Sequence, residues 1–186
     1  MKQILTIVAL LVAVATTTAQ EVVRTTHHYA THDGIELLLD RYDTNVTCEK
    51  CRPCMIFVFG GGFKQGTRDH EMYISYLERL ASEGIVAVSI DYRLGLQLYP
   101  PTGGKVSMVK ALANAVNVAV EDLYGATNFV IANAEAWNID PQLIMISGSS
   151  AGAITALQAE WLRCNGDRMA EVLPDGFRYA GVVSCA

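Results

Sequence analysis

Short apolar runs that each end at a turn constrain the fold of this chain most. Residues 55–59, 85–90 and 143–146 are such runs. A strand that is apolar at nearly every position is buried on both faces, which is typical of a parallel sheet covered by helices. Apolar residues at helical spacing lie between the runs, in 71–83 and in 106–137. This alternation predicts an α/β fold with a mostly parallel sheet flanked by helices.

The segments around this centre are expected to extend the same architecture. Two apolar-rich stretches, 22–30 and 35–42, are joined by His32-Asp33-Gly34, which predicts an antiparallel hairpin at one edge of the sheet. A helix over 153–163 and a strand over 179–184 follow the third run. We expect an interruption near Gly125 in the long helix, and loops or turns over the polar, glycine-rich and proline-rich stretches 43–53, 96–104, 138–141 and 164–176.

The first twenty residues have the composition of an export signal. Lys2 precedes the apolar stretch 4–15, and Thr17-Thr18-Ala19 fits the small-x-small cleavage pattern. The stretch is too short for a good membrane span, and small rather than basic residues follow it. The sequence therefore predicts a signal peptide over 1–19, a mature chain that begins at Gln20, and a secreted or periplasmic protein without a membrane anchor.

Charge and size limit the classes of partner. The chain has 186 residues, which suits one domain, and a formal net charge of −5 with scattered Lys and Arg. This distribution gives no electrostatic reason to expect nucleic acid or an anionic membrane as a partner.

Five cysteines raise the question of metal or disulfide chemistry. Cys48, Cys51 and Cys54 have a metal-like spacing, but Cys164 and Cys185 are distant in sequence. A disulfide within the cluster, or from the cluster to Cys164, fits an oxidising compartment better than a metal site does. The odd number leaves at least one thiol unpaired within the chain.

Residues 148–152 read G-S-S-A-G, the pattern G-x-S-x-G, between a predicted buried strand and a predicted helix. A sharp strand-to-helix turn would expose the hydroxyl of Ser150 and place the next backbone N–H at a helix N-terminus. The flanking positions of such a turn crowd against the backbone, so Gly148 and Gly152 fit there. Ser150 is therefore a candidate nucleophile; the alternative is a tight turn without chemistry.

A second motif, Gly60-Gly61-Gly62, follows another buried strand. Glycines there allow the chain to turn and present backbone N–H groups to a bound carbonyl oxygen. A phosphate-binding loop is disfavoured because no G-K-[ST] follows. Two motifs at strand ends support one site built from several loops. Behind the second buried run, we expect Tyr92 to pack and Arg93 to pair with an acid such as Asp122.

The motifs F-G-G-G-F-K-Q-G, D-Y-R-L-G and G-S-S-A-G-A resemble those of the carboxylesterase/lipase branch of the α/β-hydrolases, over roughly residues 35–186. The resemblance implies an α/β-hydrolase fold that is incomplete at its C-terminal side, with 20–186 as its N-terminal part. It also implies ester cleavage by Ser150, with an oxyanion hole formed by the backbone N–H groups of Gly61, Gly62 and Ala151, and without metal or cofactor. Small-molecule or polysaccharide-linked esters are the expected substrates, by analogy of fold.

The triad order of that family is serine, then acid, then histidine. His27, His28, His32 and His70 all precede Ser150, and only acids follow it. We expect the triad acid and histidine to lie beyond Ala186, so that this chain alone is inactive. The alternatives are a complete but inactive relative that binds a ligand or partner, an unusual base at His70, and a secreted serine peptidase of the same fold.

Overall fold

A computed structural model describes residues 21–44 and 51–185. The predicted signal peptide and Cys48 lie outside these ranges. Among the described residues, no helix combines the length and the apolar character that crossing a bilayer requires.

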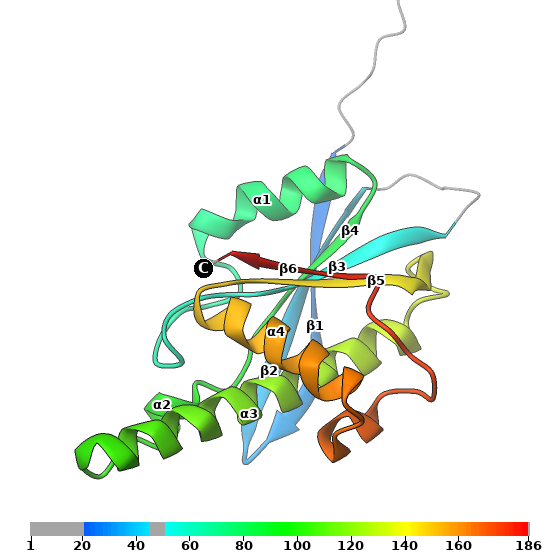
Figure 1. Ribbon diagram of the computed structural model, residues 1–186. Helices are drawn as coiled ribbons and strands as arrows, with labels where there is room; N and C mark the ends of the chain where they lie inside the picture. Colours follow the sequence, from blue (N-terminus) through cyan, green and yellow to red (C-terminus); the bar gives the residue numbers. More distant parts are fainter. Residues whose placement is uncertain (1–20, 45–50, 186) are drawn as a thin grey trace, which may run out of the picture.

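A six-stranded sheet with the order β1-β2-β4-β3-β5-β6 forms the centre of the molecule (Figure 1). β2 is antiparallel to β1 and to β4, whereas the pairs β4–β3, β3–β5 and β5–β6 are parallel. The predicted mostly parallel sheet with an antiparallel hairpin is therefore confirmed. The strands are β1 (Val22–His32), β2 (Ile35–Thr44), β3 (Arg52–Val58), β4 (Val86–Ile90), β5 (Ile139–Ser149) and β6 (Gly181–Cys185).

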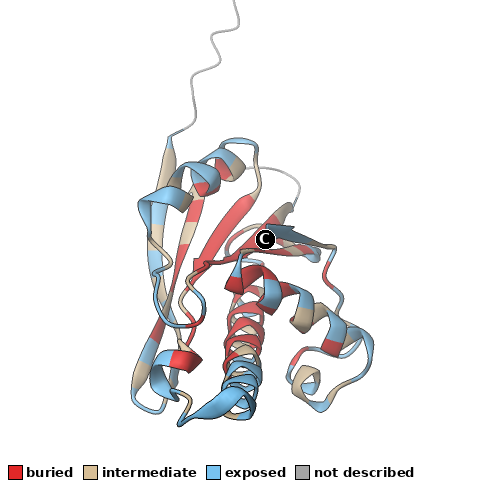
Figure 2. Ribbon diagram, turned by 60° about the vertical axis from the view of Figure 1, so that its left-hand side comes forward, coloured by how far each residue is buried: buried red, intermediate tan, exposed pale blue. Residues whose placement is uncertain are grey.

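Helices cover both faces of this sheet. Helix α1 (Glu71–Ser82) lies on one face, and α3 (Gly104–Ala132) and α4 (Ala151–Cys164) lie on the other (Figure 1). Two short helices complete the elements, α2 (Gly95–Leu98) and the 3-10 helix η1 (Arg168–Val172). Buried residues gather in the central strands and in the C-terminal half of α3 (Figure 2). The described elements thus form the three layers of an α/β sandwich.

The leading hairpin forms as its turn sequence predicts. Asp33 and Gly34 have φ angles of 52° and 78°, and His32 pairs with Ile35 across the turn. Positive φ at both central positions matches the right-handed twist of the flanking strands, which explains Asp-Gly at this place.

Four local expectations are wrong. Helix α3 continues through Gly125, because its buried neighbours, such as Leu123 and Tyr124, are held by packing that outweighs a glycine penalty of about 1 kcal/mol. The expected turn at 138–141 already belongs to β5 from Ile139 onward, since Ile139 is buried and pairs with Arg52. The expected loops 96–104 and 164–176 contain most of α2 and all of η1, respectively.

The register of the parallel strands brings three strand ends together. Val58 in β3 is the partner of both Ile90 in β4 and Gly148 in β5. The carboxyl ends of parallel strands lie at one edge, where α/β proteins bind ligands. The loops that carry the glycine motif, Tyr92 and Ser150 therefore leave the sheet at the same edge.

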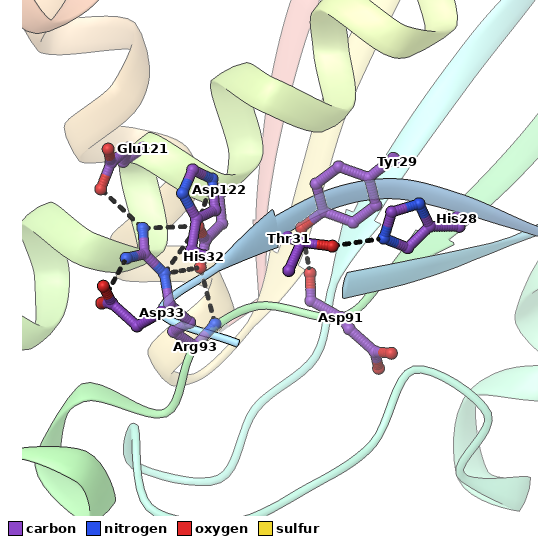
Figure 3. A network of polar contacts seen from close by, with 9 residues as sticks. All are labelled: His28, Tyr29, Thr31, His32, Asp33, Asp91, Arg93, Glu121 and Asp122. Atoms are coloured by element: carbon purple, nitrogen blue, oxygen red, sulfur yellow. Dashed lines mark hydrogen bonds and ion pairs between the residues drawn. The ribbon is translucent and has the colours of Figure 1, made fainter. Parts of the chain in front are cut away.

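A buried polar network ties the loop after β4 to helix α3 (Figure 3). Arg93 donates from Nη2 to Asp122 Oδ1 at 2.8 Å and from its backbone N to Asp122 Oδ2 at 2.7 Å. The same guanidinium donates to Glu121 at 2.6 Å. Burial raises the pKa of the Asp122 carboxyl, although the hydrogen bonds from Arg93 act in the opposite direction. The predicted pairing of Arg93 with an acid is confirmed.

Tyr92 packs on the loop that follows β3, as expected. Its ring lies 4.5 Å from that of Phe59, centroid to centroid, and its hydroxyl donates to the Phe59 carbonyl at 3.1 Å. On the hairpin side, the Tyr29 hydroxyl donates to the Asp91 carbonyl at 2.6 Å. These contacts fix the strand-end loops against one another.

Substitution of Arg93 by Met should lower the free energy of unfolding by about 3–5 kcal/mol, because the fully buried Asp122 would lose its main partner. Urea denaturation measures this loss. Arg79→Met is the matched control: the ion pair of Arg79 with Glu83 is exposed, so its loss should cost less than about 1 kcal/mol. Equal unfolding midpoints for the two variants would contradict the assigned role of Arg93.

The outer side of α4 is apolar and exposed. Ile154, Leu157 and Trp161 follow helical spacing, and Trp161 is 58% exposed. Strand β6, beside α4, pairs only with β5 among the described residues, and its Val183 is exposed as well. An exposed apolar face next to an open strand edge favours association.

The isolated 186-residue chain should therefore self-associate at micromolar concentration, and the double substitution Leu157→Lys with Trp161→Lys should reduce this. Size-exclusion chromatography with light scattering measures the mass. Met72→Lys, which replaces an exposed apolar residue on α1, serves as the control and should leave the association unchanged. A stable monomer of the unmodified chain would contradict this expectation.

Candidate active site

Ser150 lies in a strained turn between β5 and α4. Its backbone angles are φ 49° and ψ −111°, a region that non-glycine residues rarely adopt. The Ser150 amide donates to the Cys185 carbonyl in β6 at 2.8 Å, and its carbonyl accepts from Ile154 in the first turn of α4. Neighbouring elements therefore hold the turn from both sides.

The two glycines around Ser150 are required by close backbone contacts. A Cβ on Gly152 would lie 2.0 Å from the Val58 carbonyl oxygen, and one on Gly148 would lie 2.2 Å from the carbonyl of Gly152. Contacts below 3.0 Å essentially never occur for a real Cβ. The start of α4 is consequently seated directly on the end of β3.

The glycine motif after β3 meets the Ser150 turn. A Cβ on Gly60 would lie 2.9 Å from the Ser149 carbonyl oxygen and 3.2 Å from Ser150 Cβ. Gly61 and Gly62 have φ angles of 132° and 64°, where L-residues are strained. The two predicted motifs, distant in sequence, therefore lie in contact.

Three backbone N–H groups near this contact are candidate donors to a substrate. In the part of the chain that the structure describes, the amides of Gly61 and Gly62 donate no hydrogen bond to a protein acceptor. Ala151 is the first residue of α4, and amides of a first helical turn have no acceptor within the helix. The positive end of the helix dipole adds to the attraction for an anion there.

A cavity of about 440 Å³ opens beside the glycine motif. The N-terminal turn of α1 forms one wall, and the backbone of the glycine loop forms the other. It is lined by Gly60, Gly61, Gln65, Gly66, Thr67, His70, Met72 and Tyr73.

The histidines of β1 have partners away from Ser150. The His27 ring lies 5.0 Å from that of Trp137, and a ring nitrogen of His28 is 2.8 Å from Thr31 Oγ1. His32 lies 3.8 Å from the Asp122 carboxylate in the polar network (Figure 3). The structure does not bring these side chains to the Ser150 turn.

His70 is the histidine that lines the cavity. It is the N-cap of α1, and its Nδ1 accepts the Met72 amide at 3.2 Å. Its side chain is thus engaged in starting the helix.

The cysteines that the sequence favours for a disulfide differ widely in exposure. Cys54 is fully buried in β3, whereas Cys51 and Cys164 are exposed, and all three are free thiols. Burial raises the pKa of the Cys54 thiol far above its usual value. No bridge forms among these three residues because Cys54 points into the core; Cys48 lies outside the described residues.

Sequence reasoning missed Tyr73, whose hydroxyl accepts the Gly60 amide at 3.3 Å. The sole signal in the sequence is the position of Tyr73 at the start of the helix that follows the glycine loop.

This combination of sheet, glycine loop and serine turn has counterparts among known proteins. Residues 39–167 match the family model described as BD-FAE. The chain belongs to the BD-FAE family. Gut esterase 1 of Caenorhabditis briggsae is 29% identical over 130 residues, which cover 70% of this chain and 22% of that protein. Cholinesterase 1 of Branchiostoma lanceolatum is 34% identical over 100 residues, which cover 53% and 26% of the two chains.

Among solved structures, the thermophilic esterase Est2 of Thermogutta terrifontis is similar to this BD-FAE family member with a TM-score of 0.56. The sequence identity is 28%, and the match covers 74% of this chain and 42% of that chain. The α/β-hydrolase fold of carboxylesterase type is thereby confirmed. The chain spans about a fifth of the length of the first curated relative, 22%, and less than half of the solved esterase.

Gly152→Ala should lower the free energy of unfolding by about 3 kcal/mol, because the added methyl would overlap the backbone carbonyl of Val58. Gly125→Ala is the matched control, since its Cβ would lie 3.7 Å from the Tyr29 ring, and it should stabilise α3 by up to about 1 kcal/mol. Urea unfolding of both variants measures the difference. A Gly152→Ala protein that unfolds at the wild-type midpoint would show that α4 is not seated on β3.

Proposed function

We propose that the protein containing this chain hydrolyses carboxylic esters, with Ser150 as the nucleophile. The observation that carries this proposal is the contact between the two motifs: Gly60 lies so close to the Ser150 turn that any side chain on it would touch Ser150 Cβ. Acyl transfer requires a nucleophile that attacks the carbonyl carbon and donors that stabilise the resulting oxyanion. The serine turn and the glycine loop would supply these two components at one edge of the sheet.

The proposed reaction follows from these positions. Ser150 Oγ attacks the ester carbonyl carbon while a base takes its proton. The carbonyl oxygen becomes an oxyanion and accepts hydrogen bonds from the amides of Gly61, Gly62 and Ala151. The carbonyl re-forms as the C–O bond to the alcohol breaks, and the alcohol leaves with the proton held by the base. Water then attacks the acyl-serine by the same route and releases the acid.

We propose that the base and its acid partner belong to sequence beyond Ala186. Three observations support this. No histidine follows Ser150 in the sequence, the described histidines have other partners, and the chain spans 22% of its curated relative and 42% of the solved esterase. Residues 20–186 would then be the N-terminal part of the hydrolase domain, exported after removal of residues 1–19.

The substrate proposed for this chain is a small-molecule ester. Relatives are named esterase or cholinesterase, and one is the fumonisin B1 esterase of Sphingopyxis macrogoltabida, 33% identical over 106 residues. Because these names point to different esters, they support the ester bond as the shared feature.

The test uses p-nitrophenyl acetate and paraoxon, since esterase 2 of T. terrifontis is known in a form phosphorylated by paraoxon. In the protein as the natural gene encodes it, we expect ester turnover and one diethylphosphoryl group on Ser150, located by tandem mass spectrometry. Ser150→Ala should abolish the adduct and lower kcat by at least about 10³-fold.

Ser149→Ala is the matched control, because it removes the neighbouring hydroxyl while Ser150 is kept; we expect activity within about threefold of wild type. The isolated 186-residue chain should show little or no turnover. Full activity in Ser150→Ala would overturn the nucleophile, and wild-type rates in the isolated chain would overturn the proposed position of the base.

A further inference from the structure

Tyr73 connects helix α1 with the start of the glycine loop. Its ring packs on Phe57 of β3, with 4.7 Å between ring centroids, and its hydroxyl oxygen accepts the Gly60 N–H at 3.3 Å. The phenol is half-buried and lines the cavity beside the loop. A strand residue therefore fixes the ring, and the ring in turn fixes a loop amide.

This hydroxyl lies close to the proposed nucleophile. A Cβ on Gly60 would be 3.4 Å from the Tyr73 hydroxyl oxygen and 3.2 Å from Ser150 Cβ. Gly60 thus lies between the side chains of Tyr73 and Ser150 and is close to both. Any shift of the Gly60 peptide changes its position relative to Ser150.

Three consecutive glycines have large conformational freedom, yet donors in an oxyanion site must be held within about 0.5 Å. On the far side of the loop, the Gly61 carbonyl accepts the amides of Lys64 and Gln65 at 3.2 and 3.3 Å. On the near side, the peptide between Phe59 and Gly60 is held at both ends: its carbonyl accepts from the Tyr92 hydroxyl at 3.1 Å, and its N–H donates to the Tyr73 hydroxyl at 3.3 Å. Gly61 therefore lies between the hydrogen bonds of its own carbonyl and a peptide that two side-chain hydroxyls hold, and of these two only the Tyr73 hydroxyl binds the N–H of Gly60.

We infer that Tyr73 is a positioning residue for the oxyanion loop. The inference rests on the proposed ester hydrolysis and extends it: the Tyr73 hydroxyl orients the Gly60 peptide, and thereby the Gly61 amide that follows it. Without the hydroxyl, the Gly60 N–H loses its acceptor. The donor N–H groups of the loop are then held less firmly in the positions that the oxyanion of the transition state requires.

The chain offers a matched control on the same helix. Tyr76 lies one turn further along α1, and its ring also packs on Phe57 at 5.7 Å. In the described structure its hydroxyl makes no hydrogen bond to the glycine loop. Tyr76→Phe therefore removes a similar hydroxyl from a similar aromatic contact without touching the hydrogen bond of Gly60 to Tyr73.

The experiment compares Tyr73→Phe with Tyr76→Phe in the protein as the natural gene encodes it. With p-nitrophenyl acetate we expect Tyr73→Phe to lower kcat about 10- to 30-fold and to change KM by less than about twofold. A trifluoromethyl ketone, which forms a tetrahedral adduct with a serine, should bind more weakly by the same factor as the loss in kcat/KM. Tyr76→Phe should match wild type in all three measurements.

Amide hydrogen exchange in the same full-length proteins gives a readout that needs no activity. Tyr73→Phe should accelerate exchange at Gly60 by at least about tenfold, and Tyr76→Phe should not. Unchanged exchange, unchanged kcat, or a loss of kcat with undiminished ketone binding would each overturn the role of Tyr73. These results are distinct from failure of the proposed function, which would appear as wild-type activity that survives Ser150→Ala.

Discussion

The parallel pairing of β3 with β5 determines where the candidate site residues lie. Val58 and Gly148 are partners in that pairing, so the chain leaves the two strands side by side. Gly152 then approaches the Val58 carbonyl so closely that a methyl group would sit 2.0 Å from its oxygen. The Ser150 turn and the glycine loop are therefore parts of one packed unit, and their relative position is set by backbone contacts of the sheet.

This packing explains how a strained serine is maintained. A non-glycine residue at a sparsely populated φ/ψ combination costs on the order of 1–3 kcal/mol and persists only where its surroundings determine it. At Ser150 the amide is bound by the Cys185 carbonyl, and the following residues continue directly into α4. The buried pair of Arg93 and Asp122 fixes the next loop along the same edge. Rigid elements around a strained residue are the arrangement expected of a preorganised site.

The sequence was sufficient for features that depend on local pattern and insufficient for those that depend on packing. Asp33-Gly34 predicts its hairpin because the turn type itself demands positive φ. Gly125 misleads because helix propensity is weak compared with the burial of its neighbours. Cys54 illustrates the same limit, since its spacing from Cys51 contains no information that β3 already begins at Arg52 and buries Cys54 in the core. The contact of Tyr73 with Gly60 depends on how α1 packs on Phe57, which no local pattern encodes.

The tautomer of His70 argues for a base outside the described residues. A neutral imidazole has one nitrogen that donates and one that accepts. The Nδ1 of His70 accepts the Met72 amide, so its proton is on Nε2, and neither nitrogen has a lone pair available for the Ser150 proton. To act as the base, His70 would have to release its N-cap hydrogen bond, at a cost of about 1 kcal/mol. The backbone donors of this site are set by the fold and do not titrate, so in the proposed reaction we expect the pH dependence to follow the base that we place beyond Ala186.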